Sequence, residues 1–324
     1  MVMYKQIEVL LKRALEHHQK GKITQAEALY NQIIKLEPNH ADALHLLGVI
    51  AHQLGSQDSA HDLITKSILV KPDYAEAHYS LGNLLRDKEQ TEQAISSYRK
   101  ALVINPCFPE ALNNIGVLLH FESKLEEASE NFETALEIKP DYAEAHYNLG
   151  NLLLEMKELR KAIVHYEKAI AISSDYFEAY NNLGTAFQDL KKFTEAVAVF
   201  RKSLAIKPND YKILYNLANG LRDLGNLDEA IVVYKKVLAL EPNYSEAHLN
   251  IGNLFLDLGH LDAAKSAYRK VISINLHSAT AYYNLGITFM EEGHLREGLE
   301  NIRKGKGIVE FRSSEQNANF HILK

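Results

Sequence analysis

The chain has 324 residues, of which 46% are hydrophobic and 24% charged, and its formal net charge is −6. This charge argues against binding to the phosphate backbone of nucleic acids, which needs a basic surface, and no stretch reaches the about 18 apolar residues of a membrane span. We therefore expect neither nucleic-acid nor membrane partners. The single cysteine, Cys107, cannot form an internal disulfide, which favours a cytoplasmic protein.

From residue 7 onward the chain repeats with a period of 34 residues. The segments "KPDYAEAHYSLGNLL" from Lys71 and "KPDYAEAHYNLGNLL" from Lys139 lie two periods apart and differ at one letter. A small residue recurs at one place in eight successive periods, at Gly48, Gly82, Gly116, Gly150, Gly184, Ala218, Gly252 and Gly286. Such regular recurrence predicts a repeat protein. We place nine repeats in residues 1–312, beginning near 7, 41, 75, 109, 143, 177, 211, 245 and 279, followed by a tail or capping segment at 313–324.

Each repeat is predicted to form two helices, and we number its positions 1 to 34. In the repeat 143–176, apolar or small residues occupy positions 4, 7, 8 and 11, and again 20, 21, 24, 27 and 28, which is helical spacing. Six of the seven prolines fall at position 32, where a proline would end the second helix. The small residues at positions 8 and 20 leave space for the large side chain at position 24.

These letters, with Leu-Gly at positions 7 and 8, Ala at 20, an aromatic residue at 24 and Pro at 32, resemble the tetratricopeptide repeat. The resemblance implies an all-α fold, a right-handed superhelical solenoid of antiparallel helix pairs, whose first helices line a concave groove. One helix pair cannot bury both of its apolar faces, whereas stacked neighbours can.

Polar residues recur opposite the apolar stripe of the predicted first helices. Positions 2, 6, 9 and 13 fall within about 60° of one another on a helix. Because asparagine is a mediocre helix former and its amide both donates and accepts, we expect this row to bind the backbone of an extended partner segment. The acidic edges favour polar or basic partners. The predicted partner-binding residues at these positions are Asn114, Asn148, Asn182, Asn216, Asn250, Asn284, Asn83, Asn151, Asn219, Asn253, Asp189, Asp223 and Asp257.

Position 5 carries tyrosine in every second repeat, including Tyr147 and Tyr215. These rings are predicted either to flank the groove as partner contacts or to pack against the adjoining helix. Both alternatives are open at the level of sequence.

Three functions fit this pattern. The first is a non-catalytic scaffold that binds extended protein segments. The second is the substrate-recognition arm of a modifying enzyme, because the asparagine row resembles the repeat region of protein O-linked N-acetylglucosamine transferases. The third is a self-assembling structural organiser. We expect no enzymatic activity, no cofactor and no metal site, since the histidines at position 4 fit packing roles, and we expect a possible homodimer through the terminal repeats.

Overall fold

The computed structural model describes residues 2–306, and the predicted tail at 313–324 lies outside them. The described residues form eighteen helices and no strand, which confirms the all-α prediction. The first helices of the pairs are α1 (Val2–Gln19), α3 (Ala41–Gln53), α5 (Ala75–Asp87), α7 (Pro109–Phe121), α9 (Ala143–Glu155), α11 (Phe177–Asp189), α13 (Tyr211–Asp223), α15 (Ser245–Asp257) and α17 (Ala279–Glu291). The second helices are α2 (Ile23–Leu36), α4 (Gln57–Val70), α6 (Thr91–Ile104), α8 (Leu125–Ile138), α10 (Leu159–Ile172), α12 (Phe193–Ile206), α14 (Leu227–Leu240), α16 (Leu261–Ile274) and α18 (Leu295–Gly305).

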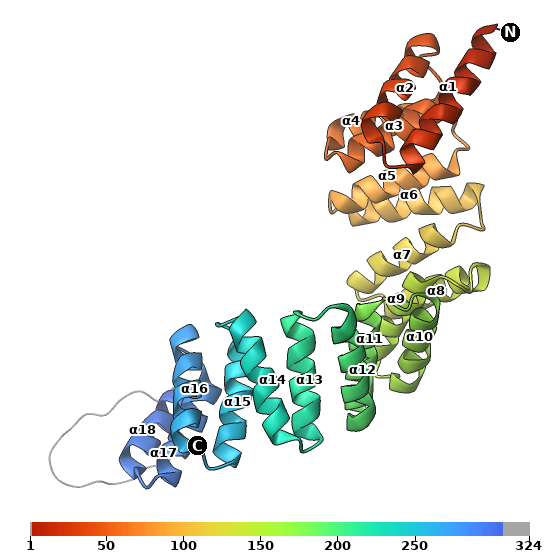
Figure 1. Ribbon diagram of the computed structural model, residues 1–324. Helices are drawn as coiled ribbons and strands as arrows, with labels where there is room; N and C mark the ends of the chain where they lie inside the picture. The colour runs from red at the N-terminus through yellow and green to blue at the C-terminus, as the bar shows by residue number, and fades with distance from the viewer. Residues whose placement is uncertain (1, 307–324) are drawn as a thin grey trace. The chain divides into compact units, whose positions relative to one another are not determined.

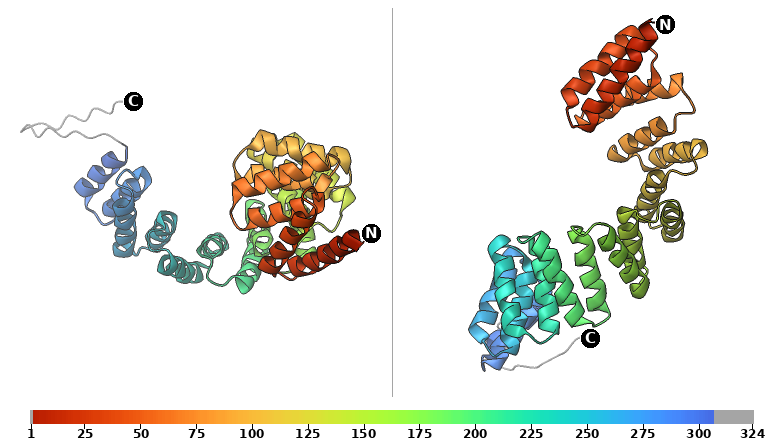
Figure 2. Two further views of the ribbon diagram at one scale, coloured as in Figure 1. Left: turned by 90° about the horizontal axis from the view of Figure 1, so that it is seen from above. Right: turned by 45° about the vertical axis from the view of Figure 1, so that its right-hand side comes forward.

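The chain consists of two compact parts, which we call the N-terminal half (residues 1–174) and the C-terminal half (175–324). In both, the two helices of each pair lie side by side and run in opposite directions, as Figures 1 and 2 show. Successive pairs within a half also pack on one another. Each half is therefore a stack of helix pairs with a core that continues from repeat to repeat.

The core of each pair is a close contact between a small residue on the first helix and a large one on the second. Tyr166 at position 24 is fully buried against Gly150 at position 8, where a Cβ atom would lie 2.7 Å from the ring atom Cε1. Phe200 is fully buried against Gly184 in the same way, and a Cβ atom at Gly184 would lie 2.5 Å from Cε1 of the ring. The packing prediction for these positions is thus confirmed, because a Cβ atom at Gly150 or Gly184 would collide with the ring. Repeat 7 instead has Ala218 opposite the buried Tyr234, so one repeat accommodates alanine at position 8.

The turn inside each pair uses a left-handed residue at position 15. Five repeats place glycine there, the residue that adopts this conformation without strain. The other four place a residue with a side chain at φ between 59° and 63°, namely Glu89, Ser123, Lys157 and Lys191. The second helices α2 to α16 all end at position 30 whether or not proline follows, as α10 and α16 show. Proline is therefore not required to end them.

Candidate functional site

Equivalent positions on successive first helices contact one another within each half. Three pairs join position 12 of one repeat to position 13 of the next: His52–Asp87 at 2.9 Å, His120–Glu155 at 2.7 Å and Gln188–Asp223 at 2.8 Å. We call the side chains at positions 2, 5, 6, 9, 12 and 13 the first-helix face. The contacts show that this face is continuous from repeat to repeat within a half.

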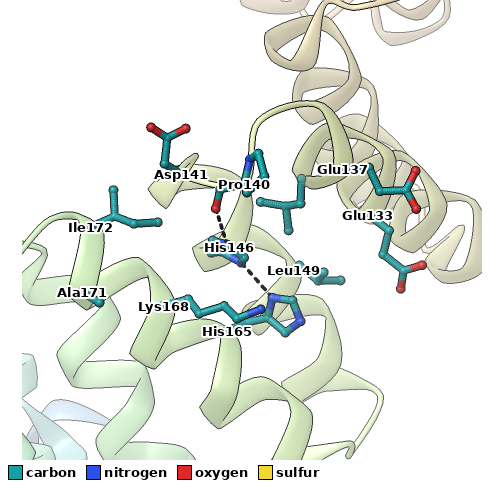
Figure 3. A pocket seen from close by; sticks show the side chains of 11 residues that line it. Glu133, Glu137, Pro140, Asp141, His146, Leu149, His165, Lys168, Ala171 and Ile172 are labelled. Atoms are coloured by element: carbon teal, nitrogen blue, oxygen red, sulfur yellow. Dashed lines mark hydrogen bonds between the residues drawn. The ribbon is translucent and has the colours of Figure 1, made fainter.

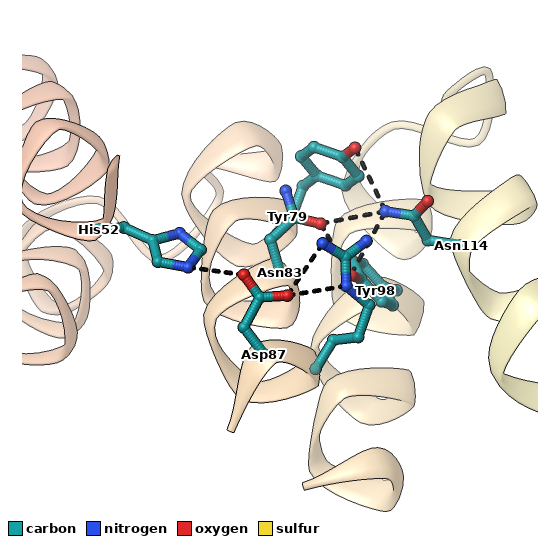
Figure 4. A network of polar contacts seen from close by, with 7 residues as sticks. His52, Tyr79, Asn83, Asp87, Tyr98 and Asn114 are labelled. Atoms are coloured by element: carbon teal, nitrogen blue, oxygen red, sulfur yellow. Dashed lines mark hydrogen bonds and ion pairs between the residues drawn. The ribbon is translucent and has the colours of Figure 1, made fainter. Parts of the chain in front are cut away.

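The amide of Asn114, at position 6 of its repeat, is bonded to the preceding repeat. Its Nδ2 donates to Asn83 Oδ1 at 3.0 Å and lies 3.3 Å from the hydroxyl oxygens of Tyr79 and Tyr98 (Figure 4). The Tyr98 hydroxyl itself donates to Asn83 Oδ1 at 2.7 Å. Burial raises the pKa of Tyr98 to about 12, so the hydroxyl keeps its proton for this bond at neutral pH. Asn114 is only 8% exposed and belongs to the packed interior.

Four of the other five asparagines at position 6 follow the same rule. Their Nδ2 atoms donate to position 5 or position 9 of the preceding repeat: Asn148 to Asn113, Asn216 to Asn181, Asn250 to both Asn219 and the hydroxyl of Tyr215, and Asn284 to Asn253. Asn182 is partly buried, and its Oδ1 accepts from Asn181 at 3.2 Å. The amides therefore connect neighbouring helix pairs.

Position 9 has a structural partner that the sequence analysis missed. Wherever a repeat has asparagine at position 9, it has tyrosine at position 24, and the buried hydroxyl donates to the amide oxygen: Tyr98 to Asn83, Tyr166 to Asn151, Tyr234 to Asn219 and Tyr268 to Asn253. Repeats with Phe132 or Phe200 at position 24 carry Val117 or Thr185 at position 9 instead. This co-occurrence is visible in the sequence and identifies position 9 as the acceptor for a buried hydroxyl.

These bonds correct one expectation about the row. The asparagines at position 6 were expected to offer both the donor and the acceptor of their amides to a partner, but the donors of Asn114, Asn148, Asn216, Asn250 and Asn284 are used between repeats. Among the described residues, no group donates to the amide oxygens of these five. What they offer to a partner is therefore an acceptor, and their part in partner binding stays a prediction.

The carboxylates at position 13 differ in their partners. Asp223 accepts from Gln188 and from Arg222, and Asp87 accepts from His52 and Arg86. Asp189, Asp257 and Glu291 are exposed and have no hydrogen bond or ion pair with any residue in the described part of the chain. The C-terminal half thus carries three carboxylates at equivalent positions that are free to accept.

The tyrosines at position 5 pack against neighbouring rings. The ring centre of Tyr215 lies 6.1 Å from that of Tyr234 and 5.0 Å from that of Tyr244, and Tyr147 lies 6.1 Å from Tyr166. The alternative in which these rings pack is therefore present in the structure. Both tyrosines remain partly exposed, and their contact with a partner stays a prediction.

The histidines at position 4 fix the start of their repeats. The Nε2 atoms of His78, His146 and His248 lie 3.0, 3.1 and 2.9 Å from the carbonyl oxygen of the proline six residues earlier. In residues 2–306, no group of three or more His, Cys, Asp or Glu side chains is placed to hold a metal ion. None of the helices described is long and apolar enough to cross a membrane.

A second feature is an open pocket of about 680 Å³ on the N-terminal half, lined by parts of α8, α9 and α10 (Figure 3). Two histidines meet in it, with His146 Nδ1 at 3.0 Å from His165 Nδ1. Because His146 Nε2 donates to Pro140, the neutral His146 accepts at Nδ1, and His165 must donate. Burial, then His146 and Lys168, lower the pKa of His165 to about 4, and burial also lowers the pKa of His146. Both rings are therefore neutral at pH 7.

This pair makes stability depend on pH. A histidine whose folded pKa lies below its unfolded value near 6.5 binds its proton more readily in the unfolded chain, so stability falls as the pH drops from about 6.5 toward 4. We expect the thermal midpoint of the protein to fall by a few degrees between pH 7 and pH 5. His165→Gln should reduce this decrease, whereas the same change at the exposed His277 should leave it unaltered. If the thermal midpoint fell equally with pH in His165→Gln and His277→Gln, the histidine pair would not titrate as described.

Comparison with known proteins agrees with this architecture. Tetratricopeptide repeat profiles match residues 11–67, 177–210 and 245–277, and a further profile described as TPR repeat matches 82–120, 122–157, 150–191 and 218–259. Together these matches cover most of the chain. The chain belongs to the tetratricopeptide repeat family. A search of the curated proteins gave no match.

Solved tetratricopeptide repeat proteins resemble the chain as well. PilF of Pseudomonas aeruginosa is 22% identical over 62% of this chain and 92% of its own, with a TM-score of 0.57. The APC/C hetero-tetramer Cut9–Hcn1 is 17% identical over 82% of this chain and 52% of its own, with a TM-score of 0.58. These similarities show the fold alone. YrrB, described as a TPR protein with an unusual peptide-binding site, is 28% identical over 56% of this chain and 93% of its own, but its TM-score of 0.48 is too low to support an argument.

Proposed function

We propose that this tetratricopeptide repeat protein is a non-catalytic scaffold that holds extended, basic segments of partner proteins along its first-helix face. The observation that carries the proposal is the imbalance between acceptors and donors on that face. The amide donors of Asn114, Asn148, Asn216, Asn250 and Asn284 are used between repeats, while within residues 2–306 no group donates to their oxygens or to the carboxylates of Asp189, Asp257 and Glu291. A partner that supplies N–H groups and positive charge complements such a surface.

An extended segment suits this face for a geometric reason. Acceptors recur once per repeat, and packed helices lie about 8–10 Å apart, which is close to three residues of extended chain. Backbone N–H groups along such a segment, together with Lys or Arg at intervals, can meet successive repeats. The net charge of −6 favours the encounter with a basic partner.

Neutralising the free carboxylates should weaken this binding. The variant Asp189→Asn, Asp257→Asn, Glu291→Gln removes three charges from the face without touching the core. We expect its affinity for a labelled 12-residue peptide of alternating Ser and Lys to fall about tenfold, since three exposed charge contacts together are worth about 1.4 kcal/mol. Isothermal titration or fluorescence polarisation at 50 and 150 mM salt measures this, and the wild-type affinity should fall at the higher salt.

The control variant removes the same charge elsewhere on the C-terminal half. Glu195→Gln, Asp228→Asn and Glu297→Gln lie on second helices, are exposed, and have no ion pair with any other described residue. This control should bind the peptide as the wild type does. Equal affinities for the face variant and the control, or preference for a Ser–Glu peptide, would refute the proposal.

A further inference from the structure

The first-helix face of repeat 4 departs from its neighbours. We propose that Val117 and Phe121 form an apolar subsite that takes one aromatic or large aliphatic side chain of the bound segment, with a basic residue on each side of it. This inference rests on the proposed function, because it assumes that extended segments bind this face. It adds a specificity element, located in the N-terminal half, that the acceptor row does not supply.

Val117 and Phe121 occupy positions 9 and 13 of α7, four residues apart, and so lie on the same side of the helix. Phe121 is 88% exposed and Val117 is 37% exposed. Position 13 is Asp87 in the preceding repeat and Glu155 in the following one, and position 9 is Asn83 and then Asn151. Two apolar side chains therefore interrupt a polar surface at one repeat.

Packing explains one of these residues and leaves the other unexplained. Val117 needs no amide because the ring at position 24 of its repeat, Phe132, has no hydroxyl to satisfy. Phe121 is the last residue of α7 and makes no ring contact with any residue described in the structure. Repeats 3 and 5 to 9 have a carboxylate at this position, and an exposed phenylalanine among them is stabilised when a partner covers it.

The flanking charges indicate what that partner carries. The side chains of Asp87 and Glu155 are 40% and 55% exposed. Glu155 accepts from His120 through Oε2, and no residue in the described part of the chain donates to its other oxygen. Asp87 is held by His52 and Arg86, one on each oxygen, and each oxygen can accept again (Figure 4). An apolar side chain over Phe121 would thus lie between two carboxylates.

The spacing follows from the repeat. A step of about 10 Å between neighbouring helices corresponds to about three residues of extended chain. The segment that fits is therefore basic–x–x–apolar–x–x–basic, where the central residue is Phe, Tyr, Leu or Met and the basic residues are Lys or Arg. Because Asp87 and Glu155 flank the site alike, the chain direction is not fixed by these charges.

Peptide titration tests the subsite. The probes are a labelled peptide GSRSGFSGKSG and the same peptide with Ser in place of Phe. Wild-type protein should bind the Phe peptide about tenfold more tightly than the Ser peptide. In Phe121→Ser this preference should vanish, while the affinity for the Ser peptide stays at its wild-type value, and Phe121→Leu should retain most of the preference. Leu69→Ser, which changes a large apolar residue that is 76% exposed on the second helix α4, is the matched control and should keep the full preference.

The outcomes separate this inference from the proposed function. If Phe121→Ser keeps the wild-type preference for the Phe peptide, or if the wild type has no preference, the apolar subsite is refuted. In either case the scaffold proposal still stands, provided that the face variant at Asp189, Asp257 and Glu291 loses affinity for the Ser–Lys peptide. If that peptide binds the face variant and its control alike, the proposed function fails on its own evidence. Circular dichroism on each variant confirms that the exposed substitutions leave the helices intact.

Discussion

Gly184→Ala is expected to lower the free energy of unfolding by about 2–3 kcal/mol, which is the cost of overpacking a rigid core. The new Cβ would lie 2.5 Å from Cε1 and 2.7 Å from Cδ1 of Phe200, a fully buried ring that must shift to admit it, whereas repeat 7 already accommodates Ala218 beside Tyr234. In an unstrained helix the same substitution stabilises by up to about 1 kcal/mol, so the collision must exceed that gain. Urea unfolding followed by circular dichroism gives the difference.

Gly220→Ala is the matched control in the C-terminal half. This glycine also lies inside a helix, but its Cβ would meet nothing closer than Val197 Cγ2 at 3.3 Å. We expect a change of less than about 1 kcal/mol, in either direction. If both variants proved equally stable, the close approach of the paired helices at position 8 would not be a packing requirement.

The second large effect is expected at Asn219, the acceptor for the buried hydroxyl of Tyr234. Asn219→Val leaves the O–H of Tyr234 without an acceptor and takes one acceptor from Asn250, so we expect a loss of about 2 kcal/mol. Adding Tyr234→Phe removes the unsatisfied group and reproduces the combination of Val117 and Phe132 in repeat 4. The double variant should therefore recover about half of the loss.

A double-mutant cycle measures this coupling directly. Thr185→Val provides the comparison, because its repeat already has Phe200 at position 24, and we expect it to cost less than about 1 kcal/mol. If the effects of Asn219→Val and Tyr234→Phe are simply additive, the residue at position 9 does not accept a hydrogen bond from the tyrosine hydroxyl. The co-occurrence of asparagine at position 9 with tyrosine at position 24 would then have no structural basis.

Most of the local architecture could be predicted from the sequence because close packing constrains it tightly. A large side chain such as Tyr166 needs a glycine or alanine opposite it, so the period is visible in single letters. The turns were less predictable. Lys157 and Lys191 adopt the left-handed conformation that glycine adopts elsewhere, because the helices on both sides impose it.

The sequence predicted where the candidate site lies, but not whether its amides present donors or acceptors to a partner. Helical spacing placed Asn250 and Asn284 on one face, but spacing does not show which way an amide points. That depends on partners one repeat away, such as Asn219 and Asn253, which hold the donors and leave the oxygens. The pairing of asparagine at position 9 with tyrosine at position 24 was the available signal for this arrangement, and it requires two positions to be compared across all repeats. Phe121 is equally visible in the sequence, because every other repeat has a polar or acidic residue at position 13.

The most direct test of this account is a crystal structure of the protein with a basic extended peptide that binds its first-helix face. The account predicts that Nδ2 of Asn250 and Asn284 remains bonded to Asn219 and Asn253, and that peptide N–H groups or basic side chains donate to the asparagine oxygens and to Asp257 or Glu291. A complex in which these amides turn and donate to peptide carbonyl oxygens, or in which the peptide lies on another surface, would contradict it.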